Sequence, residues 1–350
     1  MCGYDRMQCH CSITVEAILV LNEANSLVLA KLALVEFGFD PDAVPLTFVK
    51  MRENTVFRAE TPIGAIALRL HRPGYRSRQE ISAESEFIEV LAERGFPVVW
   101  LVPTLSGEFT ALVSDGETEA VVDAQMWLEG SRQLGDTETE DGADGLEASH
   151  FTTMGSIAAR MHGVAEELAG VRSFDRAPWD AEGLVGKGAL WGDALTVPGL
   201  DDASRQQLVR TREIMQRELA EYGTSPAVYG TIHADFTPEN VLIAGDDLVV
   251  IDFDDFGDGW YLFDLATPLF FFYDHPDYQT FRASLLAGYR SDRTLSAAEE
   301  QLLDLFLVAR GYTYLGWAAT RPETDTAAFL IAEIVPHVVR IAAELERKLG

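Results

Sequence analysis

The sequence predicts an α+β fold of two lobes, in which an N-terminal five-stranded antiparallel sheet with one helix precedes a mainly helical C-terminal lobe. Runs of β-type residues gather between positions 46 and 127. An acidic stretch that is poor in apolar residues follows, from Ser131 to Glu147, and the chain beyond it has a mainly helical pattern. With 350 residues and a hydrophobic content of 47%, the chain is large enough for two cores of ordinary domain size.

The expected elements of the N-terminal lobe alternate in type. Apolar residues at helical spacing predict a helix over about residues 26–39, ending at Gly38. A second helix is expected over about residues 78–94, closed by Gly95. The strands are expected over residues 46–51, 55–61, 65–71, 109–114 and 120–127.

The chain is expected to divide into a loosely ordered extension at residues 1–25, the N-terminal lobe at 26–127 and the C-terminal lobe at 128–350. All 3 cysteines, Cys2, Cys9 and Cys11, lie in the extension. A disulfide framework would distribute cysteines through the fold, and adjacent Cys9, His10 and Cys11 differ from the spaced ligand pairs of structural zinc sites. We therefore expect no catalytic role for the extension.

The formal net charge of −29 argues against nucleic acid and anionic membranes as partners, because their phosphates would be repelled. An acidic cleft would concentrate a cationic substrate, but a solvated acidic surface adapted to salt explains the charge more simply. No apolar run of membrane-spanning length is expected, the longest lying around residues 266–273, and no signal peptide is evident. We expect a cytoplasmic protein.

The segment between residues 233 and 255 carries the chemistry. It reads HADFTPEN at residues 233–240 and VVIDFDD at residues 249–255. Phosphoryl transfer from a nucleotide needs a carboxylate to receive or orient the proton of the attacking hydroxyl, and an amide oxygen with a second carboxylate to hold magnesium. Asp235, Asn240 and Asp252 supply these groups in this order, which predicts Asp235 as the catalytic base and Asn240 and Asp252 as metal ligands.

The spacing within this segment has a physical reason. Pro238 favours a tight loop between Asp235 and Asn240, so that both side chains can face one cavity. The apolar runs 241–243 and 248–251 flank a Gly-Asp-Asp turn and predict a β-hairpin that returns the chain beside Asn240. Each piece alone fits a helix cap or an acidic turn, but three pieces in this order favour the catalytic interpretation.

The residues from Gly230 to Ala266 resemble the Brenner-type motif and metal loop of the aminoglycoside phosphotransferase and choline kinase superfamily. The run GWYLFDLA at residues 259–266 is similar to the family's G-x-x-x-x-D-L-A, and the nearest branch is the homoserine kinase type II or stress-response kinase-like one. The resemblance extends over roughly residues 26–345. It implies a protein-kinase-like two-lobe fold with ATP and Mg²⁺ as cofactors, and it says almost nothing about the substrate.

Arg69 stands where the third-strand lysine of kinases lies. The sequence departs from lysine here, but the planar guanidinium can still bind phosphate oxygens. The helix glutamate that orients this cation is expected at Glu84, with Glu80 and Glu86 as rivals, because helical spacing alone does not choose among them.

The nucleotide is expected to contact two further segments. The turn between the first two strands has no glycine, so Asn54 and Thr55 are candidates for phosphate contact on position alone. Adenine is expected at the hinge of residues 125–130, against the backbone of Met126 and Leu128, where an ordinary buried edge strand is the alternative.

Supporting residues are expected around the loop. His233 and Asp264 are expected to hold the catalytic loop by hydrogen bonds instead of taking part in the chemistry. Asp254 lies two residues beyond Asp252 and either binds a second magnesium or is a solvated turn residue. For the acceptor, Asp258, Trp260 and Asp274 are the candidates, since carboxylates and ring faces bind ammonium groups.

The leading interpretation is an ATP-dependent kinase that acts on the hydroxyl of a small molecule, with amino alcohols, hydroxy amino acids and aminoglycosides among the candidate acceptors. A Ser/Thr protein kinase of the stress-response type is a second interpretation, although no A-P-E segment follows Asp252. A non-catalytic nucleotide-binding regulator is a third, and it would have no need of Asp235. The oligomeric state stays open.

Overall fold

The computed structural model describes residues 21, 23–51, 54–135 and 145–349, and these form two compact units. The first unit comprises the described residues up to Ser77 together with Pro103–Ala124, and the second comprises Arg78–Val102 and the chain from Gln125 onward. The helix expected in the N-terminal lobe, α2 (Arg78–Glu93), thus groups with the second unit. Cys2, Cys9 and Cys11 lie outside the described residues.

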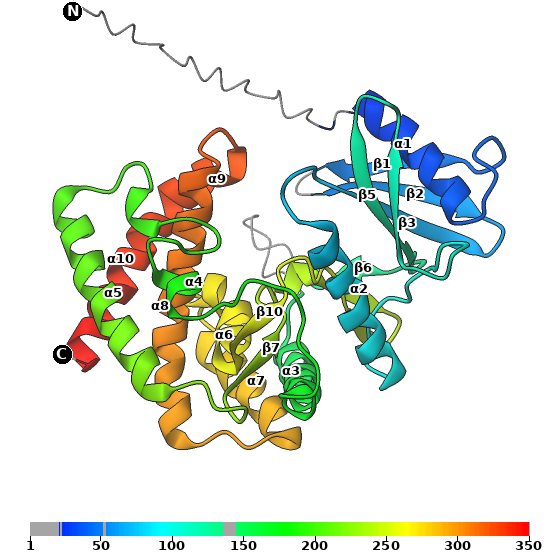
Figure 1. Cartoon of the computed structure of the whole chain (residues 1–350). Helices are drawn as coiled ribbons and strands as arrows, with labels where there is room; N and C mark the ends of the chain where they lie inside the picture. Colours follow the sequence, from blue (N-terminus) through cyan, green and yellow to red (C-terminus); the bar gives the residue numbers. More distant parts are fainter. Residues whose placement is uncertain (1–20, 22, 52–53, 136–144, 350) are drawn as a thin grey trace, which may run out of the picture. The chain divides into compact units, whose positions relative to one another are not determined.

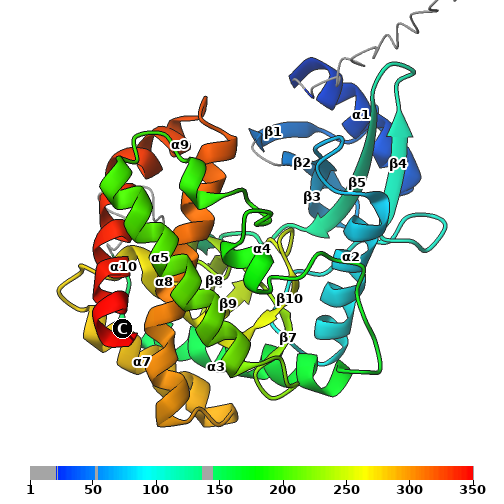
Figure 2. The ribbon, with the colours of Figure 1, turned by 60° about the vertical axis from the view of Figure 1, so that its left-hand side comes forward.

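The first unit is built on the expected five-stranded antiparallel sheet, with strand order β1-β2-β3-β5-β4 (Figures 1 and 2). Most residues of β2 and β3 are buried, consecutive ones included, and Phe57 and Leu68 are among the core residues that these strands supply. The β2–β3 turn closes where the Thr61 hydroxyl donates to the Gly64 carbonyl oxygen over 2.6 Å. The strands are β1 (Leu46–Met51), β2 (Asn54–Thr61), β3 (Gly64–His71), β4 (Thr110–Ser114) and β5 (Glu119–Met126).

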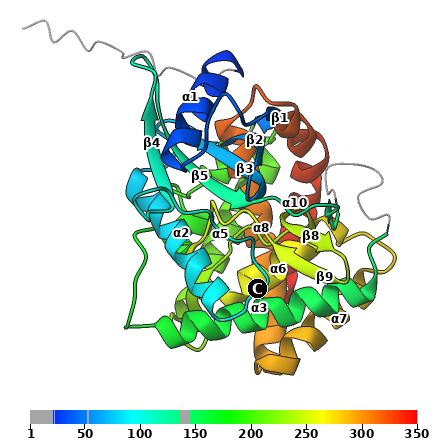
Figure 3. The same ribbon diagram turned by 90° about the vertical axis from the view of Figure 1, so that its right-hand side faces the viewer.

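Helix α1 (Glu23–Glu36) packs against this sheet through β3 and β4 (Figure 3). It is apolar on more than one side. Leu29 and Leu34 are fully buried, whereas Leu27 and Leu32 are 39% and 38% exposed. The helix was predicted correctly, but its apolar residues do not share one buried face.

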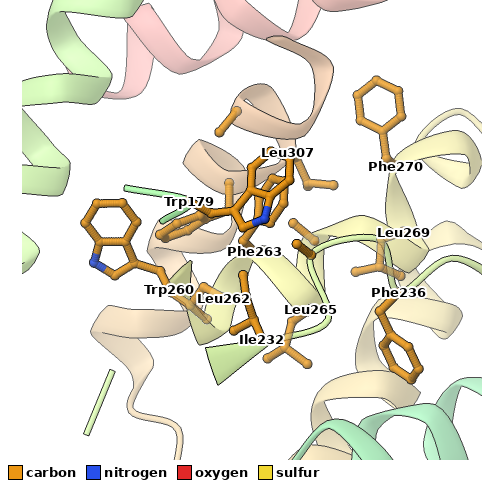
Figure 4. Packing of buried hydrophobic residues seen from close by; sticks show 14 of the residues in the cluster. Trp179, Ile232, Phe236, Trp260, Leu262, Phe263, Leu265, Leu269, Phe270 and Leu307 are labelled. Atoms are coloured by element: carbon orange, nitrogen blue, oxygen red, sulfur yellow. The ribbon is translucent and has the colours of Figure 1, made fainter. Parts of the chain in front are cut away.

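The second unit is mainly helical, as predicted (Figure 2). A continuous apolar core, part of which is drawn in Figure 4, joins its helices. Besides α2, these are α3 (Ala148–Leu168), α4 (Ala181–Val185), α5 (Asp202–Tyr222), α6 (Tyr261–Ala266), α7 (Tyr278–Asp292), α8 (Ala297–Thr320), α9 (Asp325–Phe329) and α10 (Val335–Leu349).

Two small sheets lie within the helical unit. The hairpin of β8 (Val241–Ala244) and β9 (Asp247–Val250) confirms the predicted return, and β6 (Arg132–Gln133) adds a third strand to it. The pairing of β7 (Tyr229–Ile232) with β10 (Gly257–Trp260) was not predicted. These strands are four residues long and contain three glycines, which give no alternating apolar pattern.

The C-terminal helices form one continuous stretch. From Asp325 to Leu349 the helical chain is long and apolar enough, by length and composition, to cross a membrane. The expectation that no such stretch exists was therefore wrong. Of its most apolar 18-residue window, 39% is buried inside the protein. A π-helical turn at Leu330–Ile334 joins α9 to α10. Helix α10 packs against α5 and α8, and Lys348 bonds to Asp304 of α8 over 2.6 Å. The described contacts make this stretch an integral part of the helical unit.

Helices α3 and α7 approach each other backbone to backbone (Figure 3). A Cβ atom at Gly155 of α3 would overlap the carbonyl oxygen of Leu285, and one at Gly288 of α7 would overlap that of Thr152. Neither position can take a side chain unless the helices separate. Helix α3 also contacts β7, the strand that precedes the candidate site. The close packing of α3 against α7 therefore helps to hold β7 in position.

We therefore expect Gly288→Ala to lower the free energy of unfolding by about 1–3 kcal/mol, the usual cost of overpacking. Gly163→Ala is the matched control, because a Cβ added at Gly163 on α3 would meet no atom within 4 Å. The control should be neutral or stabilising by up to about 1 kcal/mol through helix propensity. Urea unfolding monitored by circular dichroism measures both, and equal effects would contradict the close packing.

Candidate active site

The catalytic loop begins where β7 ends and runs through a short 3₁₀ turn at Pro238–Asn240. The Asn240 side-chain nitrogen donates to the Asp235 carbonyl oxygen over 2.8 Å and to Asp235 Oδ2 over 2.9 Å. The Asp235 side chain remains 26% exposed. The two side chains meet across the loop, as predicted, and Asp235 stays accessible to a reacting group.

A buried carboxylate shapes this loop. Ala234 has a left-handed backbone with φ of 65°, which is uncommon for a residue with a side chain. Asp264, in the first turn of α6, accepts the amides of His233 and Ala234 over 2.8 Å each. Its Oδ2 also lies 3.1 Å from Nε2 of His162, a buried residue of α3. Asp264 thus fixes the backbone one residue before Asp235, in the supporting role predicted for it.

His233 joins the catalytic loop to the segment after β9. Its Nε2 lies 3.0 Å from the Ile251 carbonyl oxygen, and its ring centroid lies 4.5 Å from that of Phe253. The Ile251 amide in turn donates to the Asn240 carbonyl oxygen over 3.0 Å. His233 thus makes the loop contacts expected of it, and Asp252 comes directly after a residue bonded to Asn240.

The donor groups at this place suit a hard cation such as magnesium. Because the Asn240 nitrogen is engaged by Asp235, the amide oxygen is the atom left for a metal. Asp252 adopts φ of 64°, a strained conformation of the kind found at functional sites. Carboxylate and amide oxygens are ligands that magnesium accepts together with phosphate oxygens.

The two aspartates after Phe253 have different surroundings. Asp254 is 5% exposed, and Arg176 donates to its carbonyl oxygen, so it is not a solvated turn residue. The indole N–H of Trp191 donates a hydrogen bond to Asp255 Oδ1 over 3.1 Å. The indole N–H of Trp179 donates to the backbone carbonyl oxygen of Asp255 over 2.7 Å. These bonds tie the segment after Asp252 to the helical unit.

Sequence reasoning missed Arg310 on α8, which contacts the candidate base. Its side chain is fully buried and donates to Asp235 Oδ1. Burial raises the pKa of Asp235, Arg310 opposes that rise, and the nearby Asp255 adds to it. The sequence does carry one signal: Arg310 interrupts a long apolar stretch of α8, and a charge in such a place often marks a functional site.

In the first unit, Arg69 lies on β3 and is 7% exposed. Its Nε lies 3.6 Å from Oδ2 of Asp123 on β5, and His71 Nε2 lies 2.6 Å from the same oxygen. Asn54 lies opposite His71 in the β2–β3 ladder. Asp123 is thus a carboxylate partner of Arg69 that the sequence did not suggest.

The other expected nucleotide contacts lie in the second unit. Glu84 is 2% exposed on α2, and its pairing with Arg69 stays a prediction. The Met126 amide donates to the Trp100 carbonyl oxygen over 2.8 Å, and the Leu128 carbonyl oxygen accepts the Ser131 amide over 3.3 Å. Both backbone groups already have partners, so an adenine at this hinge would use other atoms of the same residues.

The three expected substrate residues are not brought together by the described contacts. Trp260 is 2% exposed within the core drawn in Figure 4, and its indole nitrogen donates to the Gly223 carbonyl oxygen. Its ring is therefore a packing element, which corrects its assignment as a ligand platform. Asp258 accepts the Thr231 hydroxyl on the β7–β10 ladder, and Asp274 pairs with Arg340 of α10. Their roles toward a substrate stay predictions.

Comparison with known proteins places the chain in a family. The model of the phosphotransferase enzyme family matches residues 47–301. The homoserine kinase of Nitrobacter winogradskyi is 29% identical over 47% of this chain and 48% of its own length, so the chain spans about half of that relative. The homoserine kinase of Caulobacter vibrioides is 28% identical over 78% of this chain and 80% of its own.

A solved structure agrees with the same grouping. The microcompartment-associated aminopropanol kinase is 27% identical, with a TM-score of 0.79 over 93% of this chain and 98% of its own. The family match, the fold and the Asp235–Asn240 loop lead to one conclusion: the chain belongs to the phosphotransferase enzyme family.

Proposed function

We propose that this protein transfers the terminal phosphoryl group of ATP to a hydroxyl of a small molecule. The observation that carries the proposal is the contact between Asp235 and Asn240, with the Asn240 carbonyl oxygen bonded to the residue before Asp252. One contiguous loop and hairpin would thereby present the proposed base and the two proposed metal ligands. Relatives named for homoserine and aminopropanol support a small acceptor that bears an amine.

In the proposed reaction the acceptor oxygen attacks the γ-phosphorus, and the bond from that phosphorus to the β,γ-bridging oxygen breaks. The acceptor proton passes to the Asp235 carboxylate, and ADP leaves. Asn240 and Asp252 would hold Mg²⁺, and the ion would supply positive charge to offset that of the transferring phosphoryl group. Arg69 would bind phosphate oxygens from β3, Asp254 would be a candidate for a second ion, and the protein would act in the cytoplasm.

The proposal is tested by measuring ADP release from ATP and Mg²⁺ with a panel of acceptors: L-homoserine, 1-amino-2-propanol, ethanolamine, choline, an aminoglycoside and a neutral sugar. We expect an amine-bearing alcohol to raise ADP release well above ATP alone, with the phosphorylated alcohol as the product. Failure of the whole panel, together with no binding of Mg²⁺–ATP by calorimetry, would overturn the proposal.

Asp235→Asn should bind nucleotide with unchanged affinity and lose about 10²-fold or more in kcat, the scale of general-base contributions. The variant should also lower the melting temperature, because it leaves the buried Arg310 without its carboxylate. Turnover is therefore measured below the transition of the variant. Asp246→Asn, the same change at the exposed hairpin tip, is the control and should keep full activity.

Asp252→Asn tests the metal role with little change to the backbone, since asparagine tolerates the left-handed φ of 64°. Calorimetry should show that magnesium strengthens the binding of AMP-PNP to the wild type. In the variant, the affinity measured with magnesium should be weaker by at least about tenfold, or about 1.4 kcal/mol. Binding without magnesium should stay the same. If the gain persists in the variant, Asp254 is the next candidate.

A further inference from the structure

Arg310 is a fully buried cation that contacts Asp235, the candidate base. It lies in the middle of α8, its side chain is 0% exposed, and it is among the largest fully buried side chains of the described chain. A buried guanidinium is costly to desolvate unless it is well paired. The residues around Arg310 therefore need to supply both a counter-charge and hydrogen-bond acceptors.

These partners come mainly from the catalytic loop. Arg310 donates to Asp235 Oδ1, and it donates to the Ala234 carbonyl oxygen over 3.1 Å. Tyr314, one helical turn further along α8, accepts a third hydrogen bond over 2.7 Å. Arg310 thus contacts both the candidate base and the left-handed residue before it.

Aromatic rings hold the guanidinium in place. Its central carbon lies 4.2 Å from the ring centroid of Tyr314 and 4.8 Å from that of Trp191. Trp191 is fixed in turn by Asp255, and Thr320 of α8 donates to its carbonyl oxygen over 3.1 Å. A ring contact on a buried cation favours one orientation of the side chain.

The two oxygens of Asp235 are thereby divided between two partners. Oδ1 accepts Arg310, and Oδ2 accepts Asn240. With one donor on each oxygen, the carboxylate cannot rotate about its last bond without losing both bonds. We propose that Arg310 is a positioning residue that fixes the Asp235 carboxylate for the acceptor hydroxyl, an inference that rests on the proposed function.

A purely structural role would have a different signature. An arginine that only stabilised α8 would lower the melting temperature when replaced and leave the turnover of the folded enzyme unchanged. A positioning residue changes kcat, because a displacement of about 1 Å at a reacting group costs roughly 10²-fold in rate. Since Arg310 contacts the loop rather than nucleotide-binding residues, nucleotide affinity should not change.

Two variants and one control separate these roles. Arg310→Met fills the space without charge, and Arg310→Lys keeps the charge without the planar fork. Arg212→Met is the matched control, because Arg212 of α5 is also buried and paired, with Asp193. The measurements are the melting temperature, kcat and KM for the acceptor found in the screen, and calorimetric affinity for Mg²⁺–AMP-PNP.

We expect Arg310→Met to lose about 10²-fold in kcat with nucleotide affinity unchanged, and Arg310→Lys to recover part of that loss. Arg212→Met should lower the melting temperature and keep kcat. If Arg310→Met does not fold, the comparison rests on Arg310→Lys. A folded Arg310→Met or Arg310→Lys with wild-type kcat would overturn the inference.

A structural readout separates this inference from the proposed function. If the wild type turns over no acceptor, the proposed function fails, and crystal structures of the wild type and Arg310→Lys then decide the positioning role. An Asp235 side chain in several rotamers, or turned away from Asn240, would support it. The wild-type rotamer with the bond to Asn240 intact in the variant would overturn it.

Discussion

The site depends on the Asp264 carboxylate, which is buried at the start of α6 and accepts two consecutive backbone amides. An alanine in a left-handed conformation is unstable by itself, and those two charge-assisted bonds offset that cost. The turn at Ala234 aims the next residue, Asp235, at Asn240 and Arg310. His162 reaches the same carboxylate from α3, and burial lowers its pKa, so that the neutral ring donates there without adding a charge. The close α3–α7 packing therefore bears on the geometry of Asp235, the candidate base.

The parts that local sequence determines were predicted well. The strands of the first unit follow from runs of β-type residues and from turn residues, and the β8–β9 hairpin follows from two apolar runs around Gly245. The catalytic loop could be found because its residues are five apart and joined by a proline turn, so the contact between Asp235 and Asn240 is itself local. The roles of the two supporting residues, His233 and Asp264, were expected from the family resemblance over residues 230–266, since Asp264 is 31 residues away from His233.

Partners that come from distant segments could not be predicted. Arg310 is 75 residues from Asp235, and no spacing rule relates a helix residue to a loop that far away. The same holds for Asp123, which lies 52 residues from His71 along the chain. One oxygen of its carboxylate, Oδ2, lies close to both His71 and Arg69. Trp260 was misassigned for a related reason. A tryptophan next to a catalytic loop has the same sequence signal whether its ring is covered by the core or open to a ligand.

The position of Arg310 on α8 also has a consequence for how activity arises during folding. Residues 229–266 contain the candidate base, both candidate metal ligands, and His233 and Asp264, so their mutual contacts close comparatively short loops. Arg310 reaches the loop from α8, and α8 packs against the segment that bears Trp191, where Gly316 and Gly192 meet with no room for a Cβ. A chain in which the catalytic loop has formed but α8 has not docked would hold every motif residue and still lack the bond from Arg310 to Asp235. Under the proposed function, activity would then need the docked α8 as well as the motif.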